Sequence, residues 1–286
     1  MLDQIGLPDG EFAFTEADFN TIAAILRADA GIMLTHSKAS LVYARLVKRI
    51  RALGMDDFAT YCAFVTGDVG AAERKNMIEA LTTNITRFFR EPHHFDHFKT
   101  EVAPELIARA REGARVRIWS AGCSSGEEPY SIALTILSLL PDAAQYDIRI
   151  LASDINAEML NIGRRGIYGE AALAPVDPAL RARWFIPQPA PSRTRTWAVA
   201  SPVRDLVAFR ELNLVGPWPM TGPFDVIFCR NTVIYFDEEI QVRVWRQMEP
   251  LLAPNGVLYI GHSERLSGVE QFTAIGLTTY QKAEAI

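Results

Sequence analysis

The residues best placed to do chemistry lie in one turn between a predicted strand and a predicted helix. The strand is 116–119, and the chain then reads Gly122-Cys-Ser-Ser-Gly126-Glu-Glu128-Pro-Tyr. Glycine suits a backbone that bends sharply or approaches a ligand closely. Two classes of ligand use a strand, a glycine-bearing turn and a helix start in this way: dinucleotides and S-adenosylmethionine (SAM).

Charge decides between these two ligands. The pyrophosphate of a dinucleotide binds bare N–H groups at a helix start, but here Glu127 and Glu128 occupy that position and would repel it. A ligand that carries an ammonium and a sulfonium would be attracted instead. The spacing also differs from G-x-G-x-x-G. We therefore favour SAM and disfavour an oxidoreductase.

Two further segments supply candidate contacts for a nucleoside. Asp154 follows a second predicted strand, 148–152. An acid there can accept hydrogen bonds from both ribose hydroxyls, although aspartate also favours the cap of a following helix. Together with the preceding turn, its position favours ribose binding. Asn213 and Leu214, beyond a strand that ends near Phe209, are candidates for an adenine contact.

Polar residues also follow the buried strand 225–229, where the chain reads Arg230-Asn231-Thr-Val-Ile-Tyr235. In open sheets, the residues just past a strand lie where ligands bind and react. Methylases of amide nitrogen and adenine resemble one another by an Asn/Asp-Pro-Pro-Tyr signature at this place. Its absence here lowers the expectation of nitrogen methylation.

The elements that must position these residues form two regions. Strands and helices alternate from about residue 114 to the end, which predicts a mostly parallel sheet. Residues 1–80 contain only helical patterns and predict a small helical domain, and 81–113 is expected to be a linker segment that contributes to the ligand site. The segment 187–205 is rich in proline and arginine. It is either a linker or a β-insert with 196–199 as one strand, and the inserted subdomain is expected over 187–210.

Composition excludes several other classes of protein. The net charge is −5 and the pI about 5.6, which argues against a general nucleic-acid binder. The three cysteines are far apart, so reduced thiols are expected. No signal peptide is recognisable and no apolar run approaches the roughly 18 residues of a membrane span, so we expect a cytoplasmic protein. His93 and His97 have the spacing of a metal pair but no third ligand, and no metal is expected.

These segments together resemble the chemotaxis receptor glutamate O-methyltransferase family (CheR), from about Phe14 to Lys282. The resemblance is carried by five pieces of sequence. They are Leu81-Thr-Thr-Asn84-Ile-Thr86-Arg-Phe-Phe-Arg90-Glu, the run Trp119 to Ile132, Ala152-Ser-Asp154-Ile, the run Phe224 to Asp237, and Gly261-His262-Ser263-Glu264. The combination is specific, whereas no single piece is.

The resemblance implies a fold, a cofactor and site residues. The fold is a class I (Rossmann-like) SAM methyltransferase domain with an N-terminal all-helical domain and a small inserted antiparallel β-subdomain. The cofactor is SAM, and S-adenosylhomocysteine (SAH) is the product. Arg90 and Tyr235 match residues placed near the methyl group. The positions that match cofactor contacts are Asn84, Thr86, Arg90, Glu128, Asp154, Asn213, Leu214, Arg230 and Asn231.

The resemblance also implies a partner. The helix expected over 37–53 carries Arg45, Arg49 and Arg51, with no acid between residues 36 and 55. Such a stripe is ordinarily a solvated helix face, but in the resembling family it meets the methylation helices of the receptor. In some members the β-subdomain docks a peptide at the receptor's C-terminus. The insert here has four prolines and no glycine, which leaves that docking open. A monomer is expected.

The reaction implied is transfer of a methyl group to glutamate side chains of chemotaxis receptors, which gives methyl esters. A glutamate side chain with a pKa of about 4.3 is already ionised near pH 7, so no general base is required. Arg90 offers a planar cationic fork that suits a carboxylate. A SAM-binding adaptor and a methyltransferase for a different substrate remain open as alternatives.

Overall fold

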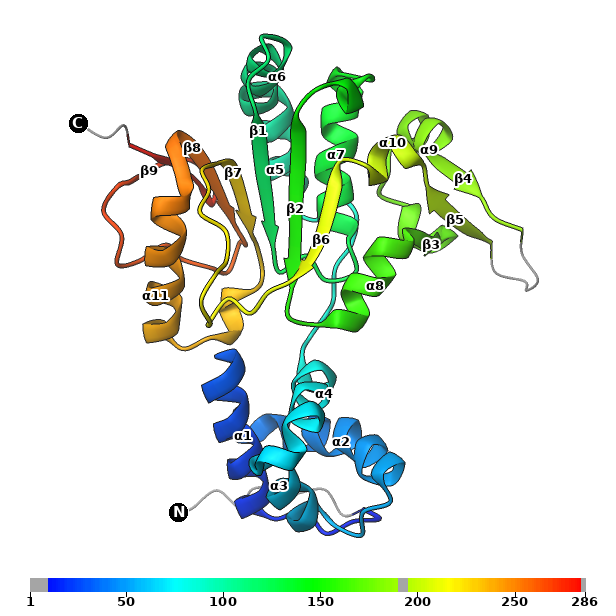
Figure 1. Ribbon diagram of the computed structural model, residues 1–286, viewed down its shortest axis with the longest axis vertical. Helices are drawn as coiled ribbons and strands as arrows, with labels where there is room; N and C mark the ends of the chain where they lie inside the picture. The colour runs from blue at the N-terminus through cyan, green and yellow to red at the C-terminus, as the bar shows by residue number, and fades with distance from the viewer. Residues whose placement is uncertain (1–9, 190–194, 284–286) are drawn as a thin grey trace. The chain divides into compact units, whose positions relative to one another are not determined.

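The computed structural model describes residues 10–189 and 195–283. They divide into two compact units (Figure 1). Each unit has buried hydrophobic side chains of its own. The helical unit comprises the described residues up to Thr83 together with Tyr235–Ile240. The methyltransferase-like unit comprises Asn84–Ile234 and the described residues from Gln241 onward. The expected boundary near residue 80 therefore lies close to the observed one.

Local capping signals define the helices of the helical unit. Thr15 accepts a hydrogen bond from the Asp18 N–H at 3.2 Å, and the Asp18 carboxylate accepts one from the Thr15 N–H at 2.9 Å, which is a capping box. The second long helix ends at Gly54 in the left-handed conformation. The elements are α1 (Glu16–Ala30), η1 (His36–Lys38), α2 (Ala39–Leu53), α3 (Phe58–Thr66), η2 (Asp68–Gly70) and α4 (Ala71–Leu81).

The segment 81–113 is more ordered than the expected linker. It contains α5 (Pro92–His97), the π-helical turn η3 (Phe98–Val102) and α6 (Ala103–Arg111). These helices contribute buried side chains to the core of the methyltransferase-like unit. The linker expectation is therefore wrong from residue 92 onward. A π-turn widens the helix, so the apolar residues of α6 are out of register with those of α5. The 3.6-residue spacing of apolar residues that marks a helix is therefore interrupted here.

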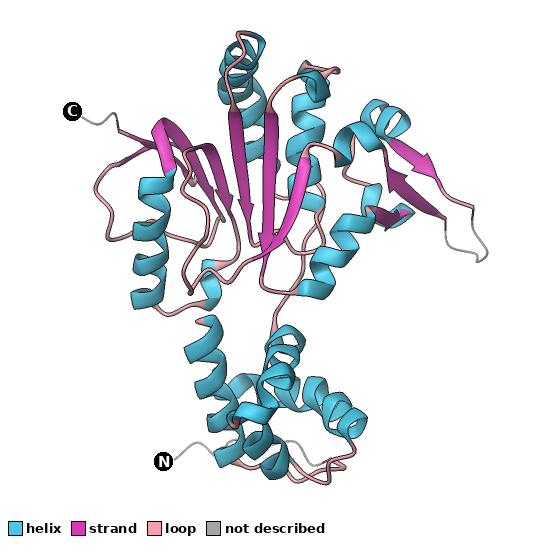
Figure 2. Cartoon of the chain, in the orientation of Figure 1, coloured by secondary structure: helices cyan, strands magenta, loops and turns pink. Residues whose placement is uncertain are grey.

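A seven-stranded sheet forms the centre of the methyltransferase-like unit within the described residues (Figure 2). Its order is β6-β2-β1-β7-β8-β10-β9, with the first five strands parallel and β10 antiparallel to both of its neighbours. This confirms the predicted, mostly parallel sheet. The strands are β1 (Val116–Ala121), β2 (Ile148–Asp154), β6 (Val207–Glu211), β7 (Phe224–Cys229), β8 (Leu252–Ile260), β9 (Phe272–Gly276) and β10 (Thr279–Lys282).

The hairpin of β9 and β10 was not predicted. The residues of β9 are half-buried or exposed throughout, so this strand carries no buried apolar pattern. The parallel strand β7, in contrast, is buried at every position and was recognised from its continuous apolar run. Exposure therefore explains why one strand was visible in the sequence and the other was not.

The remaining helical segments connect these strands, and α6, α7 and α8 pack against the sheet. Along α7, ten residues are buried, which fits its apolar composition. No helix among the described residues is both long and apolar enough to span a bilayer. The segments are α7 (Glu127–Leu139), η4 (Ala143–Gln145), α8 (Ala157–Arg165), η5 (Glu170–Leu173), α9 (Pro178–Trp184), α10 (Ser201–Arg204), η6 (Val233–Tyr235), α11 (Glu238–Met248) and η7 (Glu249–Leu251).

A small antiparallel sheet is inserted between β2 and β6 of the large sheet. Its order is β3 (Ile167–Gly169), β5 (Thr196–Val199) and β4 (Phe185–Pro187), which confirms both the antiparallel insert and the strand at 196–199. The expected range 187–210 was wrong, because the insert begins at Ile167 and the residues from 207 belong to β6. Two of its strands have three residues each, too short to show a period of two. Residues 190–194 of the predicted range lie outside the described residues.

Candidate active site

The turn after β1 approaches the loop after β7 closely. Gly122 and Gly126 have φ angles of 81° and 97°, which side chains rarely adopt. A Cβ on Gly122 would lie 2.2 Å from the Thr232 hydroxyl oxygen. Glycine is therefore required here both for the conformation and for the approach of the two segments.

Asp154 lies at the carboxyl end of β2 and is bonded to this turn. Its Oδ2 accepts a hydrogen bond from the Ser124 N–H at 2.8 Å, and the Ser124 hydroxyl donates to the Asn84 carbonyl oxygen at 2.9 Å. The N-cap of α8 is Asn156, whose side chain accepts from the Met159 N–H. Asn84, the turn and Asp154 thus meet at Ser124, and the capping role considered for Asp154 belongs to Asn156.

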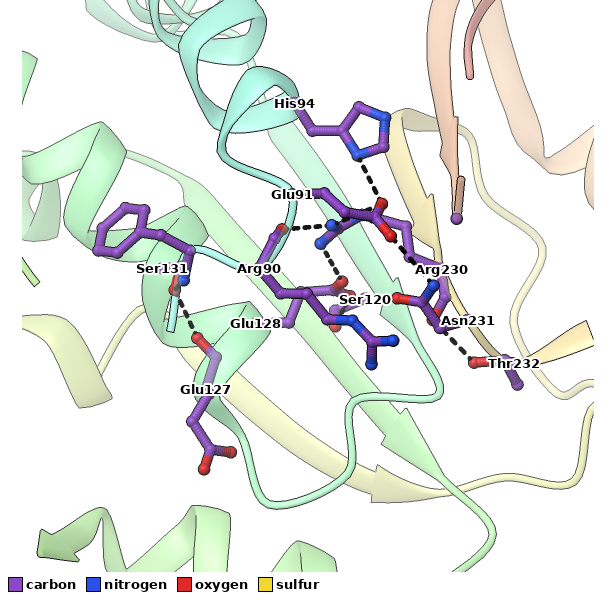
Figure 3. A network of polar contacts seen from close by, with 12 residues as sticks. Arg90, Glu91, His94, Ser120, Glu127, Glu128, Ser131, Arg230, Asn231 and Thr232 are labelled. Atoms are coloured by element: carbon purple, nitrogen blue, oxygen red, sulfur yellow. Dashed lines mark hydrogen bonds and ion pairs between the residues drawn. The ribbon is translucent and has the colours of Figure 1, made fainter. Parts of the chain in front are cut away.

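Arg230 connects the start of α7, the helix that follows the glycine turn, to the segment around Arg90 (Figure 3). Its Nη1 lies 2.9 Å from Glu128 Oε2, and its Nη2 lies 3.0 Å from Glu91 Oε2. The same Nη2 donates to the Arg90 carbonyl oxygen. The Arg230 side chain is 1% exposed, and its Nε is buried without a hydrogen-bond partner among the described residues.

The two carboxylates around Arg230 differ in their pKa. Burial raises the pKa of Glu128, and this effect outweighs the attraction of Arg230 and the hydrogen bond from Ser120. Burial alone would also raise the pKa of Glu91. The His262 hydrogen bond, the charge of Arg230 and the Asn231 amide outweigh this effect and lower the pKa of Glu91 to about 2. Glu91 is therefore a fixed negative charge in this network.

Arg90 lies in a segment whose backbone is held in an unusual conformation. The flanking residues Phe89 and Glu91 have φ angles of 51° and 56°. The Phe89 N–H donates to the Ser131 hydroxyl at 2.9 Å, and the Phe88 ring is fully buried. The Arg90 Nη1 donates to the Ile85 carbonyl oxygen at 2.9 Å, and Figure 3 shows its guanidinium pointing away from the Glu91–Arg230 pair. The buried Phe88 ring therefore anchors this segment in the core.

The remaining predicted site residues are Thr86, Asn213, Leu214 and Tyr235. Asn213 and Leu214 follow β6, and the Leu212 N–H donates to the Asp154 carbonyl oxygen at 3.0 Å, so they leave the sheet at the edge where Asp154 lies. Thr86 is half-buried in the segment before Arg90. Tyr235 belongs to the helical unit, where its carbonyl oxygen accepts a hydrogen bond from the Met33 N–H.

The three arginines of α2 each have a partner inside the helical unit. Arg49 forms a two-point contact with Glu73, at 2.9 Å and 2.5 Å. Arg45 donates to the carbonyl oxygens of residues 80 and 82. Arg51 contacts Glu11, and both side chains are largely exposed. Of the three predicted arginines, Arg51 remains accessible to a partner, because its contact with Glu11 is exposed to solvent.

Four residues of this region were missed from the sequence: Glu91, Ser124, His262 and Glu264. Glu91 Oε1 accepts from the Asn231 amide at 3.1 Å and lies 2.8 Å from His262 Nδ1. The acid adjoins Arg90 in the sequence, but Arg230, Asn231 and His262 lie 139 to 171 positions away from it. No local spacing could have indicated these contacts, although the tetrapeptide 261–264 did stand out as a motif.

The donor set fits SAM, because two acids with little exposure, Glu128 and Asp154, lie beside the turn together with the unpartnered Arg230 Nε. Residues 84–281 match the CheR methyltransferase SAM binding domain, and residues 17–82 match the CheR methyltransferase all-alpha domain. The chain belongs to the CheR methyltransferase family. SAM is thus the cofactor of this CheR methyltransferase, as predicted, and the class I methyltransferase fold is confirmed.

Relatives of this CheR methyltransferase match it over nearly its whole length. A probable chemotaxis protein methyltransferase of Rhizobium etli is 54% identical over 90% of this chain and 96% of its own length. The chemotaxis protein methyltransferase of Salmonella typhimurium is 41% identical over 94% and 91%, respectively. That of Escherichia coli is 40% identical over 94% and 91%. Both units of this chain therefore have counterparts in chemotaxis methyltransferases.

Proposed function

We propose that this protein transfers the methyl group of SAM to glutamate side chains of chemotaxis receptors in the cytoplasm, giving glutamate methyl esters and SAH. The chain is then an enzyme of receptor adaptation in bacterial chemotaxis. The match of both units to chemotaxis methyltransferases supports the receptor as substrate. The single observation that supports the chemistry is the Arg230 guanidinium between Glu91 and Glu128 beside the glycine turn.

The charge balance of this network suits a cationic cofactor. Arg230 carries one positive charge, whereas Glu91 and Glu128 supply two carboxylates, so one carboxylate is in excess. When bound, SAM supplies an electrophilic methyl group on a sulfonium. We assign the cofactor's polar contacts to Glu128, Arg230 and Asn231, and further contacts to Asn84 and Thr86 in the segment that precedes Arg90. Asp154 is assigned to the ribose, and Asn213 with Leu214 to the adenine.

The reaction is a direct displacement in which one of the substrate's carboxylate oxygens forms a bond to the methyl carbon while the carbon–sulfur bond breaks. The nucleophile is already ionised near pH 7, so the residues need only align it. Good alignment supplies up to roughly 7–11 kcal/mol of barrier reduction. Arg90 is assigned to hold this carboxylate, because one of its N–H donors is engaged by the Ile85 carbonyl and the others remain available. Tyr235 is assigned to orient the same carboxylate.

Receptor recognition is assigned to the basic helix α2. Arg51 is 56% exposed, and Lys38 and Lys48 are exposed on the same helix or at its start. These cations suit an acidic helical surface, whereas Arg45 and Arg49 contribute by keeping α2 fixed to its own unit. Like-charged residues on one face steer an oppositely charged partner in a salt-dependent way.

The small sheet is assigned to docking of a receptor's C-terminal peptide. Within the parts of the chain that the structure describes, its outer strands β3 and β4 each have one unpaired edge, and Ile167 and Ile186 are 44% and 53% exposed. An extended peptide can add to such an edge through main-chain hydrogen bonds. Pro187 lacks an N–H, which favours the β3 edge. The protein acts as a monomer, and light scattering of the purified chain tests this.

The deciding experiment uses the full chain, labelled SAM and membranes that contain a chemoreceptor. Label on the receptor that is released by mild alkali shows a carboxyl methyl ester and supports the function. Label that resists alkali points to another acceptor, since amides and methylamines are stable to this treatment. SAH binding without any transfer would leave a SAM-binding adaptor as the function.

A further inference from the structure

Three residues at the carboxyl end of β8 converge on Asn231: Gly261, His262 and Glu264, called here the β8 clamp. The Glu264 carboxylate is 5% exposed. It accepts hydrogen bonds from the Asn231 N–H at 3.0 Å and from the Gly261 N–H at 2.6 Å. It also accepts from the N–H groups of residues 232, 233 and 234, at 2.8, 2.9 and 3.3 Å. One buried carboxylate thus holds the backbone of the whole loop after β7.

Gly261 leaves the space that Asn231 occupies. A Cβ at position 261 would lie 2.5 Å from the Asn231 side-chain nitrogen and 2.7 Å from its backbone nitrogen. Both distances are far below a van der Waals contact, so any side chain here displaces Asn231. The same Cβ would lie 2.9 Å from Glu264 Oε2, so a side chain at position 261 would disturb both Asn231 and the carboxylate that holds it.

His262 reaches Asn231 through Glu91. The His262 Nδ1 lies 2.8 Å from Glu91 Oε1, which also accepts from the Asn231 amide at 3.1 Å. The His262 ring is 63% exposed, so it contributes little to the core. Figure 3 shows the Asn231 amide facing the Glu91 carboxylate. His262 contacts the same carboxylate oxygen.

Asn231 needs such support because its φ angle is 57°. The left-handed conformation is costly for a residue with a side chain and persists where the surroundings fix it. We propose that the β8 clamp is a positioning element that holds Asn231 in this conformation for the cofactor, with Glu264 as its principal positioning residue. The proposal rests on the proposed function in one respect, the cofactor contact of Asn231.

The test measures SAH affinity by calorimetry on the full chain. Glu264→Gln is expected to weaken SAH binding about tenfold, which corresponds to about 1.4 kcal/mol, and Gly261→Ala at least as much. His262→Ala, at an exposed position that cannot affect folding strongly, is expected to weaken binding about two- to fivefold. Ser263→Ala is the matched control, because Ser263 lies exposed between the clamp residues, and it should bind SAH as the unmodified chain does.

A double-mutant cycle separates positioning from general stability. In an Asn231→Ala background, the effect of His262→Ala on SAH affinity should fall below twofold, because its target is gone. Equal effects of His262→Ala in both backgrounds would overturn the clamp. So would unchanged SAH affinity in all three clamp variants when Asn231→Ala weakens binding, and this would leave the cofactor role of Asn231 intact. Unchanged affinity in Asn231→Ala itself would remove the cofactor contact and the proposal with it.

Discussion

Each unit contains a buried carboxylate that contacts an arginine, and the two contacts are built differently. In the helical unit, Glu73 receives Arg49 at both oxygens, and Tyr61 and Asn76 complete its hydrogen bonds at 3.0 and 3.1 Å. In the methyltransferase-like unit, Arg230 lies between two carboxylates and its Nε has no partner among the described residues. The first contact is complete within the protein, and the second is not.

This difference separates a contact that serves folding from one that serves a ligand. One acid opposite one base leaves no net charge, so Glu73 and Arg49 have nothing to offer a cofactor. Two acids around one base leave a negative charge in a site of little exposure, which is unfavourable until a cation arrives. The incomplete charge balance of the second contact is thus an indication of function that the first lacks.

The largest effect is expected for Arg230→Met. Removal of the guanidinium leaves Glu91 and Glu128 facing each other, which should lower the free energy of unfolding by about 3–5 kcal/mol at pH 7 and abolish measurable SAH binding. Urea unfolding and calorimetry check the two effects. The loss of stability should shrink at acidic pH, where Glu128, with its raised pKa, becomes protonated first. A Met variant as stable as the unmodified chain would contradict the comparison.

A smaller effect, confined to turnover, is expected for Arg90→Ala. A hydrogen bond to a charged group contributes about 1.5–3 kcal/mol, so turnover should fall about 10- to 100-fold. Stability should change little, because the only hydrogen bond of this side chain among the described residues is to the Ile85 carbonyl. The neighbouring exposed Arg87 supplies the control, and Arg87→Ala should methylate at the normal rate. Unchanged turnover in Arg90→Ala would remove its assignment.

The reverse pattern is expected for Arg49→Ala, with stability lowered and SAH affinity unchanged. Arg49 is about one-third exposed, so solvent screens part of its interaction with Glu73. We therefore expect its removal to lower the free energy of unfolding by about 1–2 kcal/mol. Burial alone would raise the pKa of Glu73, but the Arg49 hydrogen bonds and the other hydrogen bonds to this carboxylate lower it in the folded state. This stabilisation is therefore present above the unfolded-state pKa of about 4.3 and is lost as pH falls below it. Thermal unfolding of both chains at pH 7 and pH 3 should show a smaller difference at the lower pH.

The smallest effect is expected for Arg51→Ala, because its contact with Glu11 is exposed and weak. The melting temperature and SAH affinity should not change, whereas the KM for receptor membranes should rise a few-fold at low salt. The rise should disappear at high salt, where exposed charges are screened. Arg111→Ala, an exposed arginine of the other unit, is the control. An unchanged KM would assign receptor binding to other residues.

Sequence patterns predicted the parts of the site that are local. Each of these parts comes directly after a strand that the sequence shows clearly. They are the turn around Gly122 and Gly126, the strand end at Asp154 and the loop at Arg230. The insert was recognised as antiparallel, but its start was misplaced by 20 residues, from 167 to 187, because strands of three residues carry no readable period. The helices at 92–111 were hidden by a π-turn that shifts their apolar phase.

The sequence by itself determined the fold class, the family, the cofactor and the segments that surround it, because these depend on periodicity and on motifs short enough to read along the chain. Only the tertiary structure decided which charges meet. Glu91 and Arg230 are separated by 139 positions, and Glu264 and Asn231 by 33. A carboxylate's role depends on its burial and on the groups within hydrogen-bond reach, and both are set by how the sheet brings distant strand ends together.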